Sequence, residues 1–242
     1  MEKKSIGHHI SHQFDSDLED IRNRVLAMGG LVEKQINDAI MALAEGDVKL
    51  AEAVVNNDIS VNASEVAIDE ECSHIIARRQ PAASDLRLVV AVIKTITDLE
   101  RIGDQAERIA RMGIRLADLE RPKSGYIEIQ NMGSHVAHMV HGALDAFARM
   151  DVDAAVEVAK DDLKVDKEYD GIMRQTITFM MEDPRSITRM LDLLWTARAI
   201  ERIGDHARNI CEYVIYLVKG KDVRHTTVEQ LEKEIRGESS GA

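Results

Sequence analysis

The stretch LERIGDQAERI at Leu99–Ile109 is followed later in the chain by AIERIGDHARNI at Ala199–Ile210. The letters ERIGD are identical in the two copies, and Glu100 and Glu201 begin them at an offset of 101 residues. Each copy places a glutamate and an aspartate four residues apart, which is the spacing of neighbours on one face of a helix. A duplicated helix of this kind indicates a fold built from two copies of one module.

The repeat extends well beyond these helices. MGGLVEKQINDAIMALAEGDV (Met28–Val48) aligns without a gap with MGSHVAHMVHGALDAFARMDV (Met132–Val152), at an offset of 104 residues. VVNNDISVN (Val54–Asn62) aligns with VAKDDLKVD (Val158–Asp166) at the same offset. Such a repeat is far longer than a solenoid unit and has the length of a small helical domain.

The composition favours helices and a negatively charged surface. The chain has 242 residues, of which 45% are hydrophobic but only 3% aromatic, and it contains three prolines. This low content of strand and turn residues is typical of a helical protein. The formal net charge of −12 argues against nucleic acid or an anionic membrane surface as the main partner, and it is compatible with cation binding.

We therefore expect an all-α protein made of two tandem, pseudo-symmetric three-helix bundles, with six helices in total. Pro81 separates two helices of the first bundle, and the stretch Arg121–Gly125 links the bundles. The expected helices are Asp15–Glu45, Asp47–Arg79, Ala82–Glu120, Ile127–Arg149, Asp151–Glu182 and Pro184–Lys219. The expected divisions are residues 1–121 for the first bundle, 126–220 for the second and 221–242 for a C-terminal tail.

Cysteine usage and hydropathy point to the cytoplasm. Cys72 and Cys211 are far apart and form no CxxC pair, so we expect two reduced thiols. The start of the sequence has no apolar core of a secretory signal. No run reaches the roughly 18 apolar residues that a membrane-spanning helix requires.

The carboxylates of the repeated helices lie on an apolar stripe. With about 100° per residue, Asp104 lies about 40° from Glu100, close to Ile96 and Ile93, whereas Asp98 falls on a polar flank. Glu201 and Asp205 share their face with Met190, Leu194 and Ala197 in the same way.

The preceding helix of each module also brings acids onto its apolar stripe. In the second module these are Asp162 and Asp166; in the first they are Asp58, Glu65 and Asp69, with Asn62 at the position of Asp166. Burying an unpaired carboxylate is expensive, so positive charge must lie nearby.

Two sources of that charge remain open from the pattern alone. One is a structural ion-pair network with the arginines near the acids in sequence, which are Arg87, Arg101, Arg108, Arg198 and Arg202. The other is a metal ion, since i,i+4 carboxylates on facing helices make an oxygen-rich site for hard cations. Gly103 and Gly204 lie beside the acidic face and would let a neighbouring helix or a metal cluster approach closely.

Three segments carry a resemblance to a known family. RRQPAASDLRLV (Arg78–Val89), TDLERIGDQAERIA (Thr97–Ala110) and ARAIERIGDHARNICE (Ala197–Glu212) resemble the PhoU family of phosphate-signalling regulators, and the similarity runs over nearly the whole chain. The resemblance implies a cytoplasmic, non-enzymatic, often dimeric protein of two similar three-helix bundles. It implies as partners the ATPase subunit of the phosphate ABC transporter and the sensor histidine kinase of the phosphate regulon, which is repressed when phosphate is plentiful. Contact with the membrane would come only through partner proteins.

The resemblance also implies metal ions at E/DxxxD motifs. Carried onto this sequence, the ligands are Glu100 and Asp104, Glu201 and Asp205, and Asp162 and Asp166, with Asp58 as a further ligand. Asn62 stands where the family pattern often has a second aspartate, so we expect the second module to hold the stronger site. The metal would be Mg²⁺, Mn²⁺, Fe or Zn²⁺, and oxygen donors favour the harder ions.

Other functions receive less support from the residues. His135, His138 and His141 are three residues apart and do not share one helix face, so a surface role is favoured over a histidine metal site. A carboxylate-bridged di-metal enzyme of the bundle type uses a repeated ExxH motif, but the chain offers only Glu71–His74. A third alternative is a sensor that binds phosphate, either directly or through a metal cluster.

Overall fold

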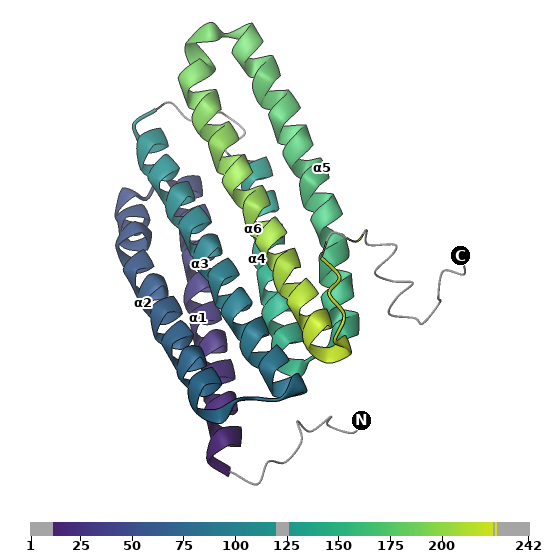
Figure 1. Ribbon diagram of the computed structural model, residues 1–242. Helices are drawn as coiled ribbons and strands as arrows, with labels where there is room; N and C mark the ends of the chain where they lie inside the picture. The colour runs from purple at the N-terminus through teal and green to yellow at the C-terminus, as the bar shows by residue number, and fades with distance from the viewer. Residues whose placement is uncertain (1–11, 120–125, 225, 227–242) are drawn as a thin grey trace, which may run out of the picture.

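The computed structural model describes residues 12–119, 126–224 and 226. Within these ranges it contains six long helices and one short 3₁₀-helix, and no strands (Figure 1). The elements are α1 (His12–Glu45), α2 (Val48–Arg79), α3 (Ala83–Ala117), α4 (Ile127–Arg149), α5 (Val152–Glu182), η1 (Pro184–Ser186) and α6 (Ile187–Lys219). The expected all-α architecture with six helices is confirmed.

The helix boundaries follow from local capping chemistry. Asp47 and Asp151 occupy equivalent places in the two modules, and their side chains accept hydrogen bonds from the backbone nitrogens of Leu50 and Ala154, each at 3.0 Å. α6 ends at Lys219 and is capped by Gly220, whose φ of 72° is the left-handed conformation that glycine adopts most easily. These signals explain why the helix limits expected from the sequence agree closely with the structure.

Two of the helix limits expected from the sequence differ from those in the structure. The third helix ends at Ala117 and not at Glu120, which lies outside the described residues. Pro184 begins η1, so the last α-helix starts at Ile187. The division into residues 1–121, 126–220 and 221–242 remains a prediction, since the link 121–125 and most of the tail, including its end GESSGA, lie outside the described residues.

The two three-helix bundles lie side by side. α1, α2 and α3 pack together, as do α4, α5 and α6, and the bundles join where α3 packs on α6 and α1 on α4 (Figure 1). α2 and α5 therefore lie on opposite outer flanks. Buried aliphatic residues form one core through both bundles, and Ile102, Ile109, Ile203 and Ile210 are fully buried. α3 and α6 are therefore covered on two faces.

A buried polar network joins α3 to α6. Asp98 is only 2% exposed. Its Oδ1 lies 2.6 Å from His206 Nδ1 and accepts a hydrogen bond from Asn209 Nδ2 at 3.2 Å, and its Oδ2 accepts one from the Tyr213 hydroxyl at 2.7 Å. The assignment of Asp98 to a polar flank is therefore wrong, because the second bundle covers that side of α3.

The modules differ in the length of their first helix. α1 has 34 residues and α4 has 23. At the offset of 104 residues, the first residue of α4, Ile127, corresponds to Asn23, so the segment 12–22 of α1 is an N-terminal extension. Phe14, Leu18 and Ile21 of this extension are buried in the core of the first bundle.

None of the described helices combines the length and the low charge that a bilayer crossing requires.

Candidate metal centres

The first acidic cluster lies between α2 and α3 and also involves α1. Asp58 of α2 is 7% exposed, and its Oδ2 accepts a hydrogen bond from Asn62 Nδ2 at 3.1 Å. Its Oδ1 lies 3.4 Å from the Nε2 of Gln35, a buried residue of α1. Glu100 of α3 is half-buried and Asp104 is exposed at the edge of the cluster. The structure thus brings Asp58, Glu100 and Asp104 into one region, as predicted.

The second cluster occupies the equivalent place between α5 and α6. Asp162 is 3% exposed and Glu201 is 7% exposed. Asp205 is half-buried, and Asp166 lies at the exposed edge. These four carboxylates interact electrostatically with one another across the two helices, so the predicted second set also lies in one region.

The two glycines permit this arrangement. A Cβ atom on Gly103 would lie 3.3 Å from Asp58 Oδ1 and 3.2 Å from Gln35 Oε1. A Cβ atom on Gly204 would lie 3.4 Å from Asp162 Oδ1. In both modules the missing side chain lets a buried aspartate of one helix lie directly against the backbone of the next, which is the close approach that the sequence predicts.

The carboxylates of both clusters are harder to ionise than usual. Burial, and then repulsion from Asp205, raises the pKa of Glu201 to about 7, although Arg198 opposes the shift. Burial also raises the pKa of Asp162 and of Asp205. In the first cluster, burial and the neighbouring acids raise the pKa of Glu100 and of Asp104. Burial is the largest cause of each shift, and repulsion between neighbouring carboxylates adds to it.

Arginines meet part of this charge in the second cluster. Arg208 Nη1 lies 3.3 Å from Asp162 Oδ2, and Arg198 forms an ion pair with Glu201 Oε1. Arg198 was among the expected partners, whereas Arg208 was not. In the first cluster, no arginine of the described ranges lies within ion-pair distance of Asp58, Glu100 or Asp104. The ion-pair network therefore accounts for part of the acidic charge in the second module, but for none of the charge of these three acids in the first.

Three buried oxygen atoms in these clusters accept no hydrogen bond: Gln35 Oε1, Asn62 Oδ1 and Glu201 Oε2. Buried acceptors without a donor are rare, and a cation would satisfy them. The donor set consists of oxygen atoms only, which fits hard divalent cations better than soft ones. Within the described ranges, no three Asp, Glu, His or Cys side chains are arranged to hold one ion, so the ligand set stays a prediction.

Gln35 is a residue that sequence reasoning missed. It lies on the apolar stripe of α1 between Val32 and Ile36, and Met139 takes its place in the second module. A polar residue on a buried stripe was the available signal. Gln35 gives the first cluster an additional amide oxygen close to Asp58.

The histidines of the second module lie apart from these clusters. His135 Nδ1 is 3.3 Å from Glu168 Oε1, and His141 Nδ1 is 2.9 Å from Glu33 Oε1 at an exposed position. In the single ExxH pair, His74 is exposed and Glu71 is partly exposed. These contacts agree with the surface role that the helical spacing favours.

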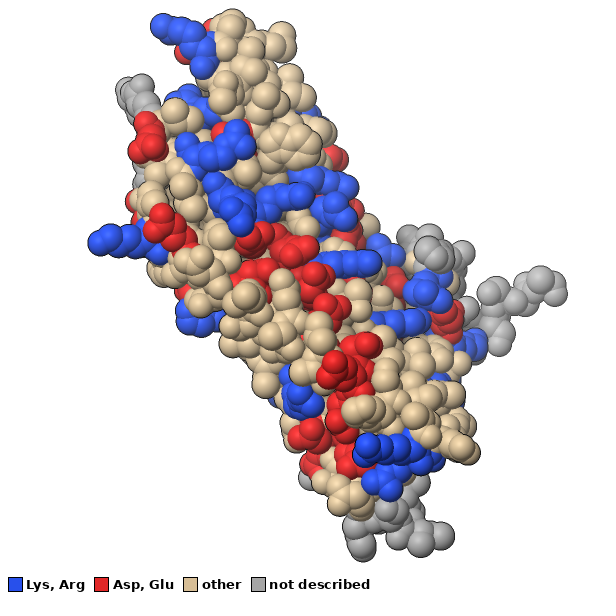
Figure 2. Space-filling model, turned by 60° about the vertical axis from the view of Figure 1, so that its left-hand side comes forward, with Lys and Arg blue, Asp and Glu red and all other residues tan. Residues whose placement is uncertain are grey.

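The acidic and basic side chains also occupy separate areas of the outer surface. On the face drawn in Figure 2, Asp and Glu side chains gather in a central patch that continues toward one end, and Lys and Arg side chains border it above. Positive charge is thus available close to negative charge at the surface, where ion pairs contribute little to stability.

The sequence matches a known family model and is similar to known proteins over nearly its full length. The family model described as "PhoU domain" matches residues 25–112 and 129–214, once in each bundle. A phosphate-specific transport system accessory protein PhoU homolog of Pseudomonas aeruginosa is 54% identical over 98% of this chain and 99% of its own length. The phosphate-specific transport system accessory protein PhoU of Escherichia coli is 49% identical over 99% of both chains.

Solved structures show the same fold. The crystal structure of PhoU from Pseudomonas aeruginosa superposes with a TM-score of 0.84 at 55% identity, covering 86% of this chain and all of that one. The crystal structure of the phosphate transport system regulatory protein PhoU from Streptococcus pneumoniae gives a TM-score of 0.81 at 31% identity, covering 87% of this chain and 99% of that one.

Proposed function

The chain belongs to the PhoU family, and from this premise we propose that it is a non-enzymatic accessory protein that regulates phosphate transport and signalling. The observation that carries this proposal is the match of the PhoU domain to both bundles, together with high identity over nearly the full chain to accessory proteins of phosphate transport. These relatives are named as accessory or regulatory proteins and not as enzymes.

The finer role that we propose is coupling between transport and gene regulation. The protein acts in the cytoplasm, as a homodimer, on the ATPase subunit of the phosphate ABC transporter and on the sensor histidine kinase of the phosphate regulon. When phosphate is plentiful it keeps the kinase inhibitory and the regulon repressed. It reaches the membrane only through these partners.

The acidic clusters are proposed as metal centres that belong to this role. Asp162, Asp166, Glu201 and Asp205 would hold the ion of the second module, and Asp58, Glu100 and Asp104 that of the first. A bound Mg²⁺, Mn²⁺, Fe or Zn²⁺ ion would supply positive charge to ionised carboxylates and open positions for a further oxygen ligand. The orphaned oxygens and the raised pKa values support this assignment.

The chain's own residues prepare these centres. Gly103 and Gly204 allow the buried aspartates to approach the central helices. Arg198 and Arg208 hold Glu201 and Asp162 in place, so a cation arriving there has to compete with guanidinium groups. Asn62 and Gln35 contribute amide groups next to Asp58 without adding charge.

A deletion strain tests the proposed function. Loss of the gene should raise alkaline phosphatase activity in phosphate-rich medium, and a plasmid copy of the wild type should restore repression. A plasmid carrying Asp145→Ala, which changes an exposed ion pair on α4, is the matched control and should also restore it. Normal repression in the deletion strain would contradict the proposal.

Calorimetry distinguishes a protein that senses phosphate by binding it from an adaptor that has no phosphate site. Inorganic phosphate is titrated into protein loaded with Mn²⁺ and into metal-free protein. Heat of binding only in the loaded sample would make the metal centre a phosphate site, and binding in neither sample supports a role as an adaptor without a phosphate site of its own.

A further inference from the structure

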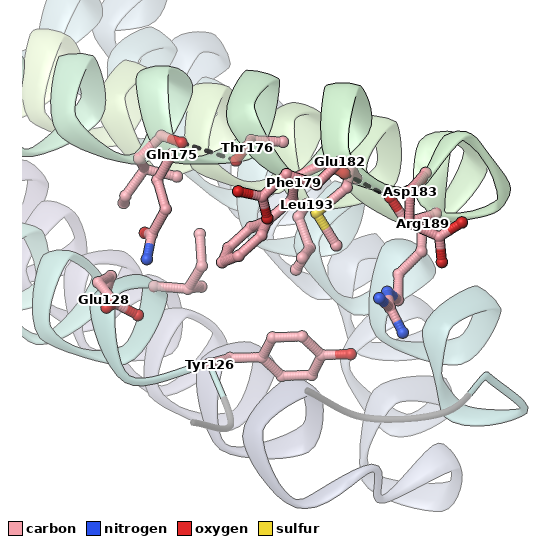
Figure 3. Close-up of a pocket in the computed structure, with 13 residues that line it drawn as sticks. Tyr126, Glu128, Gln175, Thr176, Phe179, Glu182, Asp183, Arg189 and Leu193 are labelled. Atoms are coloured by element: carbon pink, nitrogen blue, oxygen red, sulfur yellow. Dashed lines mark hydrogen bonds between the residues drawn. The ribbon is translucent and has the colours of Figure 1, made fainter. Parts of the chain in front are cut away.

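One end of the second bundle is left uncovered by the residues that the structure describes. A cavity of about 170 Å³ opens there between the start of α4, the end of α5 and the start of α6. Figure 3 shows Phe179 and Leu193 reaching into it, with Tyr126 on the opposite side. The surrounding hairpin end also exposes Ile177, Met181, Ile187, Leu191 and Trp195. Such a concentration of exposed apolar side chains on one end of a protein marks an interaction surface.

The first bundle shows what normally covers this place. Its counterpart of Phe179, at the offset of 104 residues, is Ile75, which is 2% exposed, whereas Phe179 is 44% exposed. The extension 12–22 of α1 closes the first bundle: Phe14, Leu18 and Ile21 are buried, and Asp17 pairs with Arg79 at the end of α2 at 2.9 Å. The second bundle has no such helix in the described residues, because α4 begins at Ile127.

The residues that directly precede α4 do not have the sequence of the missing helix. The counterparts of Phe14, Leu18 and Ile21 are Asp118, Pro122 and Gly125. The six residues before Tyr126, which read ERPKSG, contain no aliphatic or aromatic residue. The apolar knobs that close the first bundle are therefore missing from the sequence at the corresponding place in the second.

Charge indicates what kind of helix fits. The extension carries four acids, at Asp15, Asp17, Glu19 and Asp20. It lies against an end where α1 and α2 provide Arg24, Arg78 and Arg79. At the same three positions the second bundle has Glu128, Glu182 and Asp183, all of which line the cavity. Arg185 pairs with Asp183, and Arg189 lies at one end of the cavity, so Glu128 and Glu182 define the negative rim.

We propose that this open end is a docking groove for an amphipathic helix of a partner protein. The helix is about three turns long, or about 16 Å, with apolar residues at the i, i+4 and i+7 spacing of Phe14, Leu18 and Ile21 and with Lys or Arg on its flanks. The acidic extension of a second copy is excluded as the occupant by the reversed charge of the rim. The groove is separate from the acidic clusters, so the proposal does not depend on metal binding.

Two synthetic peptides test the groove. One has the sequence of residues 12–25; the other has the same sequence with lysine in place of its four acidic residues. In fluorescence anisotropy with the full-length protein, the basic peptide should bind saturably and at least about tenfold more tightly than the acidic parent. Glu128→Lys/Glu182→Lys should reverse this preference. Asp183 is left unchanged because its side chain caps η1 by accepting from Arg185 N.

A second variant separates the groove from general electrostatic attraction. Phe179→Glu adds a negative charge, so nonspecific binding of the basic peptide would become tighter, whereas docking in the groove should weaken by about tenfold or more. Ile59→Glu, at a 74% exposed position of α2, is the matched control and should bind like wild type. Equal binding to wild type and Phe179→Glu would overturn the proposal. So would sedimentation data in which Phe179→Glu converts a dimer to a monomer, since the occupant would then be a second copy.

Discussion

The Oδ1 atom of Asp98 in α3 lies 2.6 Å from the Nδ1 atom of His206 in α6, in the buried interface between the two bundles. By the repeat offset of 101 residues, the counterparts of Asp98 and His206 are Ala199 and Gln105. The contact therefore exists once and not twice, and it breaks the symmetry of the repeat at the place where the halves meet.

Removing one member of this pair should destabilise the protein. His206→Ala removes one of the three hydrogen-bond partners of the buried Asp98 carboxylate, and we expect a loss of about 2–4 kcal/mol in the free energy of unfolding. Urea unfolding followed by circular dichroism measures it. Asp145→Ala, which breaks the exposed Asp145–Arg149 pair, should change stability by less than about 0.5 kcal/mol. Equal effects of the two variants would show that the interface pair has no special importance.

Metal content should depend on the acids of the second module. After dialysis against Mn²⁺ and then buffer, Glu201→Gln/Asp205→Asn should retain less metal than Glu100→Gln/Asp104→Asn, because the first cluster has one carboxylate fewer to begin with. Elemental analysis gives the ratio of metal to protein. If Glu201→Gln/Asp205→Asn binds as much metal as wild type, the acids of the second module belong to an arginine network and the predicted ligands are wrong.

The first site should respond to a single added charge. Asn62→Asp places a carboxylate next to Asp58, in the position that Asp166 has in the other module. In the Glu201→Gln/Asp205→Asn background we expect a several-fold tighter affinity for Mn²⁺, measured by calorimetry. Asn56→Asp, at an exposed position of α2 two residues before the buried Asp58, is the control and should leave the affinity unchanged.

Stability of the metal-free protein should fall as the pH rises from about 4.5 to about 7. The pKa of Glu201 is raised from 4.5 to about 7 in the folded state, so in this range the folded protein binds a proton that the unfolded chain does not. Raised pKa values of Asp162 and Asp205 act in the same direction. Urea midpoints at several pH values should show the trend, and Glu201→Gln should flatten it. Glu52→Gln, at an exposed position of α2, is the control and should leave the pH dependence unchanged.

Gly103 should tolerate alanine less well than Gly30. Nothing lies within 4 Å of a Cβ built on Gly30, so Gly30→Ala should stabilise the helix by about 0.5–1 kcal/mol. A Cβ on Gly103 meets atoms of Gln35, Asp58 and Val61 at 3.2–3.3 Å, so Gly103→Ala should lose that gain or destabilise the protein. Thermal unfolding of the two variants side by side provides the comparison; equal stabilisation would mean that the cluster relaxes freely.

Much of the fold follows from periodicity and capping residues. The duplicated sequence, the N-cap aspartates and the apolar stripes define six helices and place acids of neighbouring helices in one region. The burial of Asp98 could not be predicted, because the helical period does not say which flank a second bundle will cover. Arg208 was missed because its contact with Asp162 lies on another helix. Gln35 was a visible polar residue on an apolar stripe, but its partner Asp58 also lies on another helix.

The exposure of Phe179 is a further case that only the structure reveals. In sequence it occupies the same stripe position as Ile75, which is buried, and both are apolar. The difference arises from residues far away in the chain, where the eleven residues 12–22 lengthen α1 relative to α4. Burial thus depends on an element that the stripe itself does not contain.

The unequal lengths of α1 and α4 also set the number of proposed docking grooves at one for each polypeptide. Two identical modules would present two equivalent ends, and a protein with two such ends would link partners that also have two sites into chains. Closing one end with its own residues leaves each polypeptide with a valence of one. Complexes that form through the remaining end are then discrete, and their number is set by the copies of this protein and not by the supply of partner.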